Sequence, residues 1–238
     1  MDPTSDPRRS FRHAPGLFDP EVLRALRRYL DEIEPRRQAQ AASQREANAI
    51  ARGESSDALR LDPRWFDAWR APRAALLDAI GPYGWVVYPP QVRLVRTLSH
   101  RVPWHQDAGY QRLLGLRAHL HHITCFVPID ADPANRTTLQ FARLTLDELP
   151  HASRDGFGAG VAEIPESELV AFDLALGDGL VFGDLALHRT WVPPGARVER
   201  RSLEFRLVRP QDSIADKDYF DVGAGEFVRR NGKARVAS

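Results

Sequence analysis

The segment Arg200-Arg201-Ser202-Leu203-Glu204-Phe205-Arg206-Leu207-Val208 alternates between polar and apolar side chains. Successive side chains of a β-strand point to opposite faces of the sheet, so this alternation predicts a strand that is buried on one face. The apolar face carries Leu203, Phe205 and Leu207. The opposite face carries the polar side chains Arg200, Ser202, Glu204 and Arg206.

Short strands of this kind are predicted over most of residues 85–210. From Trp85 onward, alternating or apolar runs are separated by Pro, Gly, Asp and Asn residues that are typical of turns. This spacing favours two packed antiparallel sheets over a parallel array of strands and crossover helices. The expected fold class is therefore mainly β, with flanking helices.

The helices are expected in residues 1–84. Asp19-Pro20 predicts a helix start, and apolar residues then recur at helical spacing. Pro35 is expected to open a second helix that extends to about Ile50. A further helix is expected from Ala71 to Ile80 and should end at Gly81.

A length of 238 residues with 43% hydrophobic content predicts one domain over residues 1–238. It comprises a mainly helical part (1–84), a β-rich core (85–210) and a tail (211–238). The first dozen residues and the stretch from Gly223 to Ser238 are expected to be loosely ordered.

Potential metal ligands lie in Trp104-His105-Gln106-Asp107. On an extended strand, residues i and i+2 share a face, so the His105 imidazole and the Asp107 carboxylate are expected to converge. A third ligand, His188, ends an apolar run that begins at Gly177 and is expected to come from a neighbouring sheet. Two imidazoles and one carboxylate bind one face of an octahedral metal ion and leave the other positions open, as in non-haem Fe(II) oxygenases.

The His-x-Asp motif alone is weak evidence, because the chain has 8 histidines and 32 acidic residues. Its context is more specific. His105-Gln106-Asp107, the Gly-Asp-x-Leu-Val-Phe strand before His188, and Arg-x-Ser-x-Glu-Phe-Arg from Arg200 occur in that order between about Gln91 and Val208. In this respect the chain resembles the phytanoyl-CoA dioxygenase-like family of Fe(II)/2-oxoglutarate-dependent oxygenases.

The resemblance implies a double-stranded β-helix, a relative of the jelly roll and cupin folds. It also implies Fe(II) as cofactor, 2-oxoglutarate and O2 as co-substrates, and succinate and CO2 as products. His105, Asp107 and His188 would be the catalytic metal ligands. Arg200, with Ser202 on the same face, would hold the distal carboxylate of 2-oxoglutarate, because a guanidinium binds a carboxylate through two parallel hydrogen bonds. Arg206 is the alternative arginine.

The type of oxidation is narrowed by Asp107. Related halogenases have a small residue in place of the carboxylate ligand, which opens a site for chloride. Since the carboxylate is present here, we expect hydroxylation, desaturation or ring closure of a small molecule in specialised (secondary) metabolism.

Other residues are weaker candidates. Gln91 and Arg93 share one face of a predicted strand and are expected either to contact substrate or to form a solvated edge. Tyr110 and Trp104 flank the metal motif and are expected either to line the pocket or to pack. For the cluster His119, His121 and His122, structural or ligand-supporting roles are favoured over a second metal site, with His122 on the same face as Thr124. His13, His100 and His151 are expected to be ordinary loop residues, and Cys125 a small buried hydrophobe.

Composition excludes several classes of protein. A net charge of +1 argues against a dedicated nucleic-acid binder. One cysteine permits no intramolecular disulfide, and the sequence shows neither a signal core nor a spanning segment, so a cytoplasmic protein without a membrane partner is expected.

Two alternatives to a 2-oxoglutarate-dependent oxygenase are a metal-dependent cupin-like enzyme that does not use 2-oxoglutarate, and a non-catalytic small-molecule-binding relative. The cupin-like enzyme would have no use for Arg200. The non-catalytic relative would leave the presence of His105, Asp107, His188 and Arg200 unexplained.

Overall fold

The computed structural model describes residues 6–40, 74–87, 90–95, 101–109, 121–129, 137–152, 158–159, 161, 163–196, 200–214 and 217–229 of the chain. Within these residues, the larger sheet has eight strands: β1 (Phe11–Ala14), β2 (Trp85–Val87), β3 (Gln91–Val95), β4 (His122–Pro128), β9 (Gly179–Gly183), β11 (Arg200–Val208), β12 (Asp218–Asp221) and β13 (Glu226–Arg229). Their order is β1-β9-β4-β11-β2-β12-β13, and β3 also pairs with β11.

A smaller sheet, with the order β10-β5-β8, contains β5 (Thr138–Ala142), β8 (Leu169–Ala171) and β10 (His188–Trp191). A two-stranded unit is formed by β6 (His151–Ala152) and β7 (Gly158–Ala159). The helices are α1 (Pro20–Gln40) and α3 (Ala74–Ile80), with single 3-10 turns at Glu166–Glu168 and Pro210–Asp212. Every pairing between described strands is antiparallel, so the predicted class of two antiparallel sheets with few helices is confirmed.

The two sheets are joined by a core of aromatic and aliphatic side chains. Phe126 of β4 and Phe182 of β9 meet Leu139 and Phe141 of β5 in one buried cluster. The rings of Phe141 and Phe182 lie 5.2 Å apart in an edge-to-face arrangement. The inner faces of the two sheets therefore pack against each other through this cluster.

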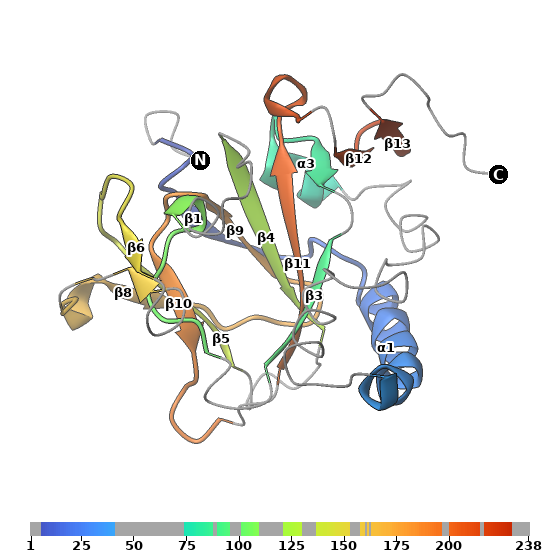
Figure 1. Cartoon of the computed structure of the whole chain (residues 1–238), viewed down its shortest axis with the longest axis horizontal. Coiled ribbons are helices and arrows are strands. Elements are labelled where there is room, and N and C mark those ends of the chain that lie inside the picture. The colour runs from blue at the N-terminus through green and yellow to red at the C-terminus, as the bar shows by residue number, and fades with distance from the viewer. Residues whose placement is uncertain are drawn as a thin grey trace.

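The helices cover the other face of the larger sheet. Figure 1 shows α1 on the side of β3 and β11 that is turned away from β5 and β10. Leu23, Leu26 and Leu30 of α1 are buried in a second cluster together with Ile80 of α3 and Phe205 of β11. The apolar residues whose spacing predicted α1 are therefore buried. At the start of the helix, the Asp19 side chain accepts a hydrogen bond from the Glu21 backbone N–H.

The alternation of β11 is confirmed. Leu203, Phe205 and Leu207 lie in the cluster under the helices. Arg200 and Ser202 are buried as well, but on the opposite face, toward the smaller sheet. The buried polar face of β11 is thus turned into the space between the two sheets.

Several boundaries differ from those expected. The helix α1 continues through Pro35 to Gln40, because a proline removes one helical hydrogen bond without always ending the helix. The expected looseness of the ends is wrong where β1 pairs with β9 and where β13 pairs with β12. Gly81, with a φ of 53°, ends α3 as predicted. The expected second helix beyond residue 40 lies outside the described residues.

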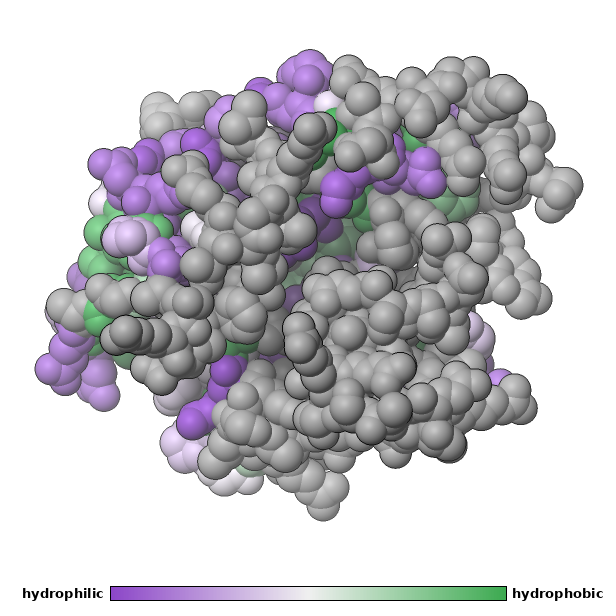
Figure 2. Space-filling model, viewed as in Figure 1, coloured by the Kyte–Doolittle hydropathy of each residue, from purple (hydrophilic) through white to green (hydrophobic). Residues whose placement is uncertain are grey.

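The described surface is mostly polar. Leu77 is the one large hydrophobic side chain that is exposed among the residues described, and hydrophilic residues line the described upper border of the face in Figure 2. In the same part of the chain, neither helix is both long and apolar enough to span a lipid bilayer.

Candidate metal centre

The two histidines of the predicted triad are brought together by the backbone. His105 N–H donates to the carbonyl of His188 at 2.9 Å, and His188 N–H donates to the carbonyl of His105 at 3.0 Å. This isolated antiparallel bridge joins the first residue of the His-x-Asp motif to the start of β10. The two imidazole rings lie 4.1 Å apart between their centroids.

The local structure around these residues differs from the expectation. Residues 107–109 form a helical turn, so His105 and Asp107 do not share one extended strand. His188 does not end the apolar strand either. The strand β9 ends at Gly183, and after a turn His188 opens β10 of the smaller sheet. A helical turn therefore brings Asp107 to His105, where strand alternation was expected to do so, and His188 comes from the smaller sheet.

The predicted convergence itself is confirmed. One ligand atom from each of His105, Asp107 and His188 lies within 4.8 Å of the other two. The three residues are only 6%, 6% and 3% exposed. Among the described residues, this is the one group of three or more His, Cys, Asp or Glu side chains close enough to hold a metal ion.

Both histidines are held in the same tautomer. The Nδ1 atom of His105 lies 2.9 Å from the carbonyl oxygen of Pro103, and Nδ1 of His188 lies 2.9 Å from that of Ala186. A carbonyl oxygen only accepts hydrogen bonds, so each Nδ1 carries the proton. The lone pair is then on Nε2, and Nε2 of His105 lies 3.9 Å from Oδ1 of Asp107. This arrangement, with the second ring nitrogen bonded to a backbone carbonyl, is typical of metal-ligating histidines.

The carboxylate of Asp107 is held from several sides. Thr124 Oγ1 donates a hydrogen bond of 2.6 Å to Oδ2, and Nε2 of His122 lies 3.7 Å from the same oxygen. Nη2 of Arg206 lies 3.8 Å from Oδ1. Burial alone would raise the pKa of Asp107, but the positive charge of Arg206 and the interaction with His122 outweigh it, and the pKa lies well below its ordinary value. The carboxylate is therefore ionised and ready to act as a ligand.

These residues fit a divalent metal ion. Two neutral imidazoles with Nε2 free of the proton and one ionised carboxylate form the two-histidine, one-carboxylate donor set of non-haem Fe(II) sites. A set of this kind occupies one face of the ion and leaves positions for other ligands.

Arg200 lies on the inner face of β11 and is fully buried. Its Nη1 donates to the carbonyl of Thr138 on β5 at 3.1 Å, and its guanidinium lies 4.8 Å from the centre of the Phe126 ring. Ser202 is fully buried beside it. Glu204, which the sequence analysis gave no role, accepts a hydrogen bond from Ser202 at 3.1 Å and lies 3.7 Å from Nη2 of Arg200.

The alternative arginine occupies a different place. Arg206 lies beside Asp107, near the other end of β11 from Arg200. Arg200 reaches the smaller sheet, whereas Arg206 contacts a residue of the triad. The two arginines therefore lie beside different groups: Arg200 beside the smaller sheet and Arg206 beside the Asp107 carboxylate.

The weaker candidates are only partly placed. Gln91 pairs with Glu204 and Arg93 with Ser202 in the register of β3 and β11, so both strand positions adjoin the polar face of β11. Tyr110 and His119 lie outside the described residues. His122, with Thr124 on the same face of β4 as predicted, approaches Asp107, so the triad's own carboxylate is its acidic neighbour.

Gln106 was not recognised as important from the sequence. Its side chain is fully buried and bonds only to backbone: Oε1 accepts from Leu149 N–H at 2.7 Å, and Nε2 donates to the carbonyls of Leu185 (2.9 Å) and Asp147 (3.1 Å). Its own N–H donates to Nε2 of His151 at 3.0 Å. Gln106 thus ties the chain between His105 and Asp107 to two other segments.

Two histidines expected in loops make tertiary contacts. His151 lies in β6 and bonds Gln106, and His13 lies in β1 with its Nε2 2.9 Å from Asp178. His100 lies outside the described residues. Nothing local in the sequence marks either histidine, because both partners are far away along the chain.

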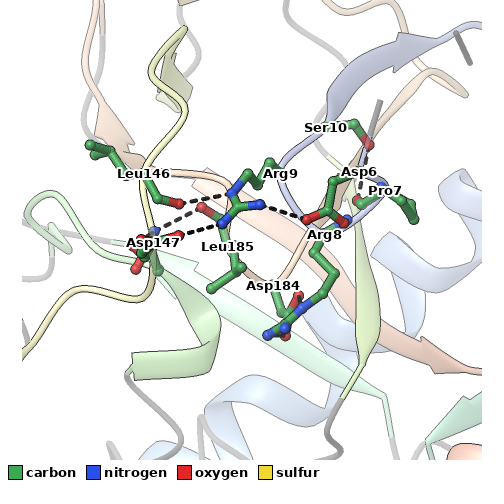
Figure 3. Close-up of polar contacts among 10 residues, drawn as sticks. Asp6, Pro7, Arg8, Arg9, Ser10, Leu146, Asp147, Asp184 and Leu185 are labelled. Carbon is green, nitrogen blue, oxygen red and sulfur yellow. Dashed lines mark hydrogen bonds and ion pairs between the residues drawn. The ribbon is translucent and has the colours of Figure 1, made fainter. Parts of the chain in front are cut away.

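The N-terminal segment also contacts the turn before His188. Figure 3 shows Arg8 directed at Asp184 and Arg9 at Asp147. The Leu185 N–H donates to the carbonyl of Arg8 at 2.7 Å. Residues that were expected to be loose therefore hold the turn from which β10 begins.

The fold is that of solved non-heme oxygenase structures. No family model matches the chain, and no curated protein matches it. The chain is similar to the non-heme monooxygenase ThoJ in its apo form (TM-score 0.59, 21% identity, 86% of this chain and 75% of that one). It is also similar to the non-heme alpha ketoglutarate dependent carbocyclase SnoK from nogalamycin biosynthesis (TM-score 0.53, 14% identity, 89% and 82%). A third structure is EctD from S. alaskensis with 2-oxoglutarate and 5-hydroxyectoine (TM-score 0.52, 16% identity, 87% and 74%). The resemblance inferred from the sequence is confirmed at the level of the fold.

Proposed function

We propose that this protein is an Fe(II)/2-oxoglutarate-dependent oxygenase that oxidises a C–H bond of a small molecule, with release of succinate and CO2. The observation that carries the proposal is the buried group of His105, Asp107 and His188, in which backbone carbonyls hold both Nδ1 protons and leave both Nε2 lone pairs for a metal ion. The names of similar structures, among them an alpha ketoglutarate dependent carbocyclase and EctD with 2-oxoglutarate, agree with it.

Each residue has a defined task in this proposal. His105 and His188 would bind the metal ion through Nε2, and Asp107 through its carboxylate, which Thr124 and Arg206 keep oriented. Arg200 and Ser202 would hold the distal carboxylate of 2-oxoglutarate. When bound, the ferrous ion and the co-substrate supply the oxidising chemistry, while the chain orients ligands and substrate.

The whole chain would form one oxygenase domain, since β1, β12 and β13 join the same sheet as β11. Gln91, Arg93 and Tyr110 would contact the substrate. The carboxylate of Asp107 favours hydroxylation, desaturation or ring closure over halogenation, and we place the reaction in specialised metabolism. A chlorinated product from assays with chloride would contradict this choice.

A second candidate is a metal-dependent enzyme of the same fold that does not use 2-oxoglutarate. It is favoured by one observation: Arg200 already has a carboxylate neighbour in Glu204. In that case Arg200 would be a structural residue.

Anaerobic spectroscopy separates the two candidates. Fe(II) and 2-oxoglutarate added together should give a weak visible charge-transfer band only if both bind at one site. Arg200→Ala should lose the band while the metal ion stays bound, and Arg206→Ala should retain it. Metal binding without any band in the unsubstituted protein would support the second candidate. Screening of small molecules for stimulated succinate release would then identify the substrate.

A further inference from the structure

The polar face of β11 contains a carboxylate at the place proposed for the co-substrate. Glu204 Oε1 accepts a hydrogen bond from Ser202 at 3.1 Å and lies 3.7 Å from Nη2 of Arg200. Ser202 and Arg200 are the two residues proposed above to hold the distal carboxylate of 2-oxoglutarate, so this inference rests on the proposed function. We refer to Arg200 and Ser202 together as the carboxylate clamp.

The Glu204 side chain has the same chemistry as the ligand proposed for the clamp. It consists of two methylene groups and a carboxylate, which is also the distal half of 2-oxoglutarate. A guanidinium and a hydroxyl that bind one of these groups will bind the other. The contacts of Glu204 are therefore those expected of the co-substrate's own carboxylate.

The clamp and Glu204 differ in their freedom to move. Arg200 is fully buried, with Thr138 and Phe126 holding its guanidinium from other sides, and Ser202 is fully buried too. The Glu204 side chain is 19% exposed. Its distance from Nη2 of Arg200, 3.7 Å, is also longer than the roughly 2.7–2.9 Å of a charge-assisted hydrogen bond. Glu204 is thus the member of the group that can withdraw.

The negative charge of Glu204 has opposite effects when the carboxylate clamp is empty and when it holds 2-oxoglutarate. Without co-substrate, Glu204 gives the buried guanidinium a counter-charge, and a buried charge without one is strongly destabilising. With co-substrate, two carboxylates would compete for the same donors, and like charges at this separation repel.

We propose that Glu204 is a resident competitor for the carboxylate clamp: it neutralises Arg200 when the clamp is empty and lowers the affinity for 2-oxoglutarate, which must displace it. The alternative is that Glu204 orients Arg200 and stays in place when the co-substrate binds. The two roles predict opposite effects of removing the Glu204 charge.

The test uses Glu204→Gln, which keeps the shape and an acceptor for Ser202 but removes the charge. Calorimetric titration of 2-oxoglutarate into nickel(II)-loaded protein reports binding without turnover. Glu204→Gln should bind 2-oxoglutarate about tenfold more tightly than the unsubstituted protein, a difference of about 1.4 kcal/mol. The exposed Glu166→Gln is the matched control and should not change the dissociation constant.

A second ligand separates competition from a general change in structure. 2-Oxobutyrate has the keto acid but no distal carboxylate, so its binding should be the same in the Glu204→Gln and unsubstituted proteins. Unchanged or weaker binding of 2-oxoglutarate by Glu204→Gln, with Arg200→Ala impaired, would overturn the competitor role and leave the proposed function standing. Absence of 2-oxoglutarate binding in both proteins would overturn both.

Discussion

The guanidinium of Arg8 donates two parallel hydrogen bonds to the carboxylate of Asp184, from Nε to Oδ1 at 2.9 Å and from Nη2 to Oδ2 at 2.8 Å. Asp184 is buried, and its carbonyl accepts a hydrogen bond from the N–H of Ala108, next to Asp107. The pair therefore connects the N-terminal segment to the chain that carries two of the proposed metal ligands. The hydrogen bond to Asp184, which outweighs desolvation, raises the pKa of Arg8.

Loss of this pair should destabilise the fold. Arg8→Ala leaves the Asp184 carboxylate buried without its guanidinium partner, so we expect the free energy of unfolding to fall. The expected loss is about 2–3 kcal/mol and no larger, because the side chain of Arg8 is partly exposed. Arg8→Lys should recover only part of this, because an ammonium cannot form the two parallel bonds. Urea unfolding followed by circular dichroism measures both. Equal stability of Arg8→Ala and the unsubstituted protein would show that the pair contributes nothing.

Gln106 should affect metal binding. Gln106→Leu removes the bonds to Leu185, Asp147 and Leu149 that position the chain between His105 and Asp107. We expect the affinity for cobalt(II) to fall about tenfold, as is common when groups behind metal ligands are removed. Titration followed by visible absorption provides the measurement, and the exposed Gln211→Leu provides the control. An unchanged cobalt(II) affinity in Gln106→Leu would contradict the positioning role.

His122 and His188 should behave differently when replaced. His188→Ala removes a proposed ligand and should abolish cobalt(II) binding. His122→Asn removes a side chain that lies 3.7 Å from Asp107 but outside the triad, so binding should persist with at most about a tenfold loss. If His122→Asn also abolishes binding, His122 is itself a ligand.

Asp178 should make stability depend on pH. Burial would raise its pKa, but hydrogen bonds from the N–H groups of Gly16 and Ala175 and from His13 outweigh burial, and the pKa is lowered in the folded state. A lowered folded pKa contributes stability above the unfolded value of about 3.9, and that stability is lost as pH falls through the folded pKa.

Asp178→Asn should therefore be less stable than the unsubstituted protein by about 1–2 kcal/mol at pH 6, and the difference should shrink below pH 4. Urea unfolding at pH 6 and pH 3 gives the comparison, with the exposed Asp173→Asn as control. A difference that is the same at both pH values would contradict the assignment to the ionised carboxylate.

Cys125 should be unreactive in the folded protein. It is fully buried in β4, and burial raises the pKa of its thiol. Because the thiolate is the reactive form, iodoacetamide should modify Cys125 only as fast as the protein unfolds. Mass spectrometry before and after addition of urea checks this, and rapid modification under native conditions would show that the thiol is accessible.

Local patterns in the sequence predicted what depends on a residue's nearest neighbours. The alternation in Arg200–Val208 predicted which side chains of β11 face the helices, and Asp19-Pro20 predicted the start of α1. The parity of β4 placed His122 on the same face as Thr124. Such predictions succeed because strand and helix periodicity link burial to positions two, three or four residues apart.

The sequence by itself determined that this chain is mainly β and that His105, Asp107, His188 and Arg200 are its candidate site residues. Only the tertiary structure decided that a backbone bridge joins His105 to His188, that Asp107 belongs to a helical turn, that Arg8 holds Asp184, and that Glu204 lies against Arg200. Each of these relationships depends on the packing of the whole chain, and most of them join segments that lie far apart in the sequence. Such contacts are decided by the register of the sheets and by the balance of buried charges, and local periodicity encodes neither of these.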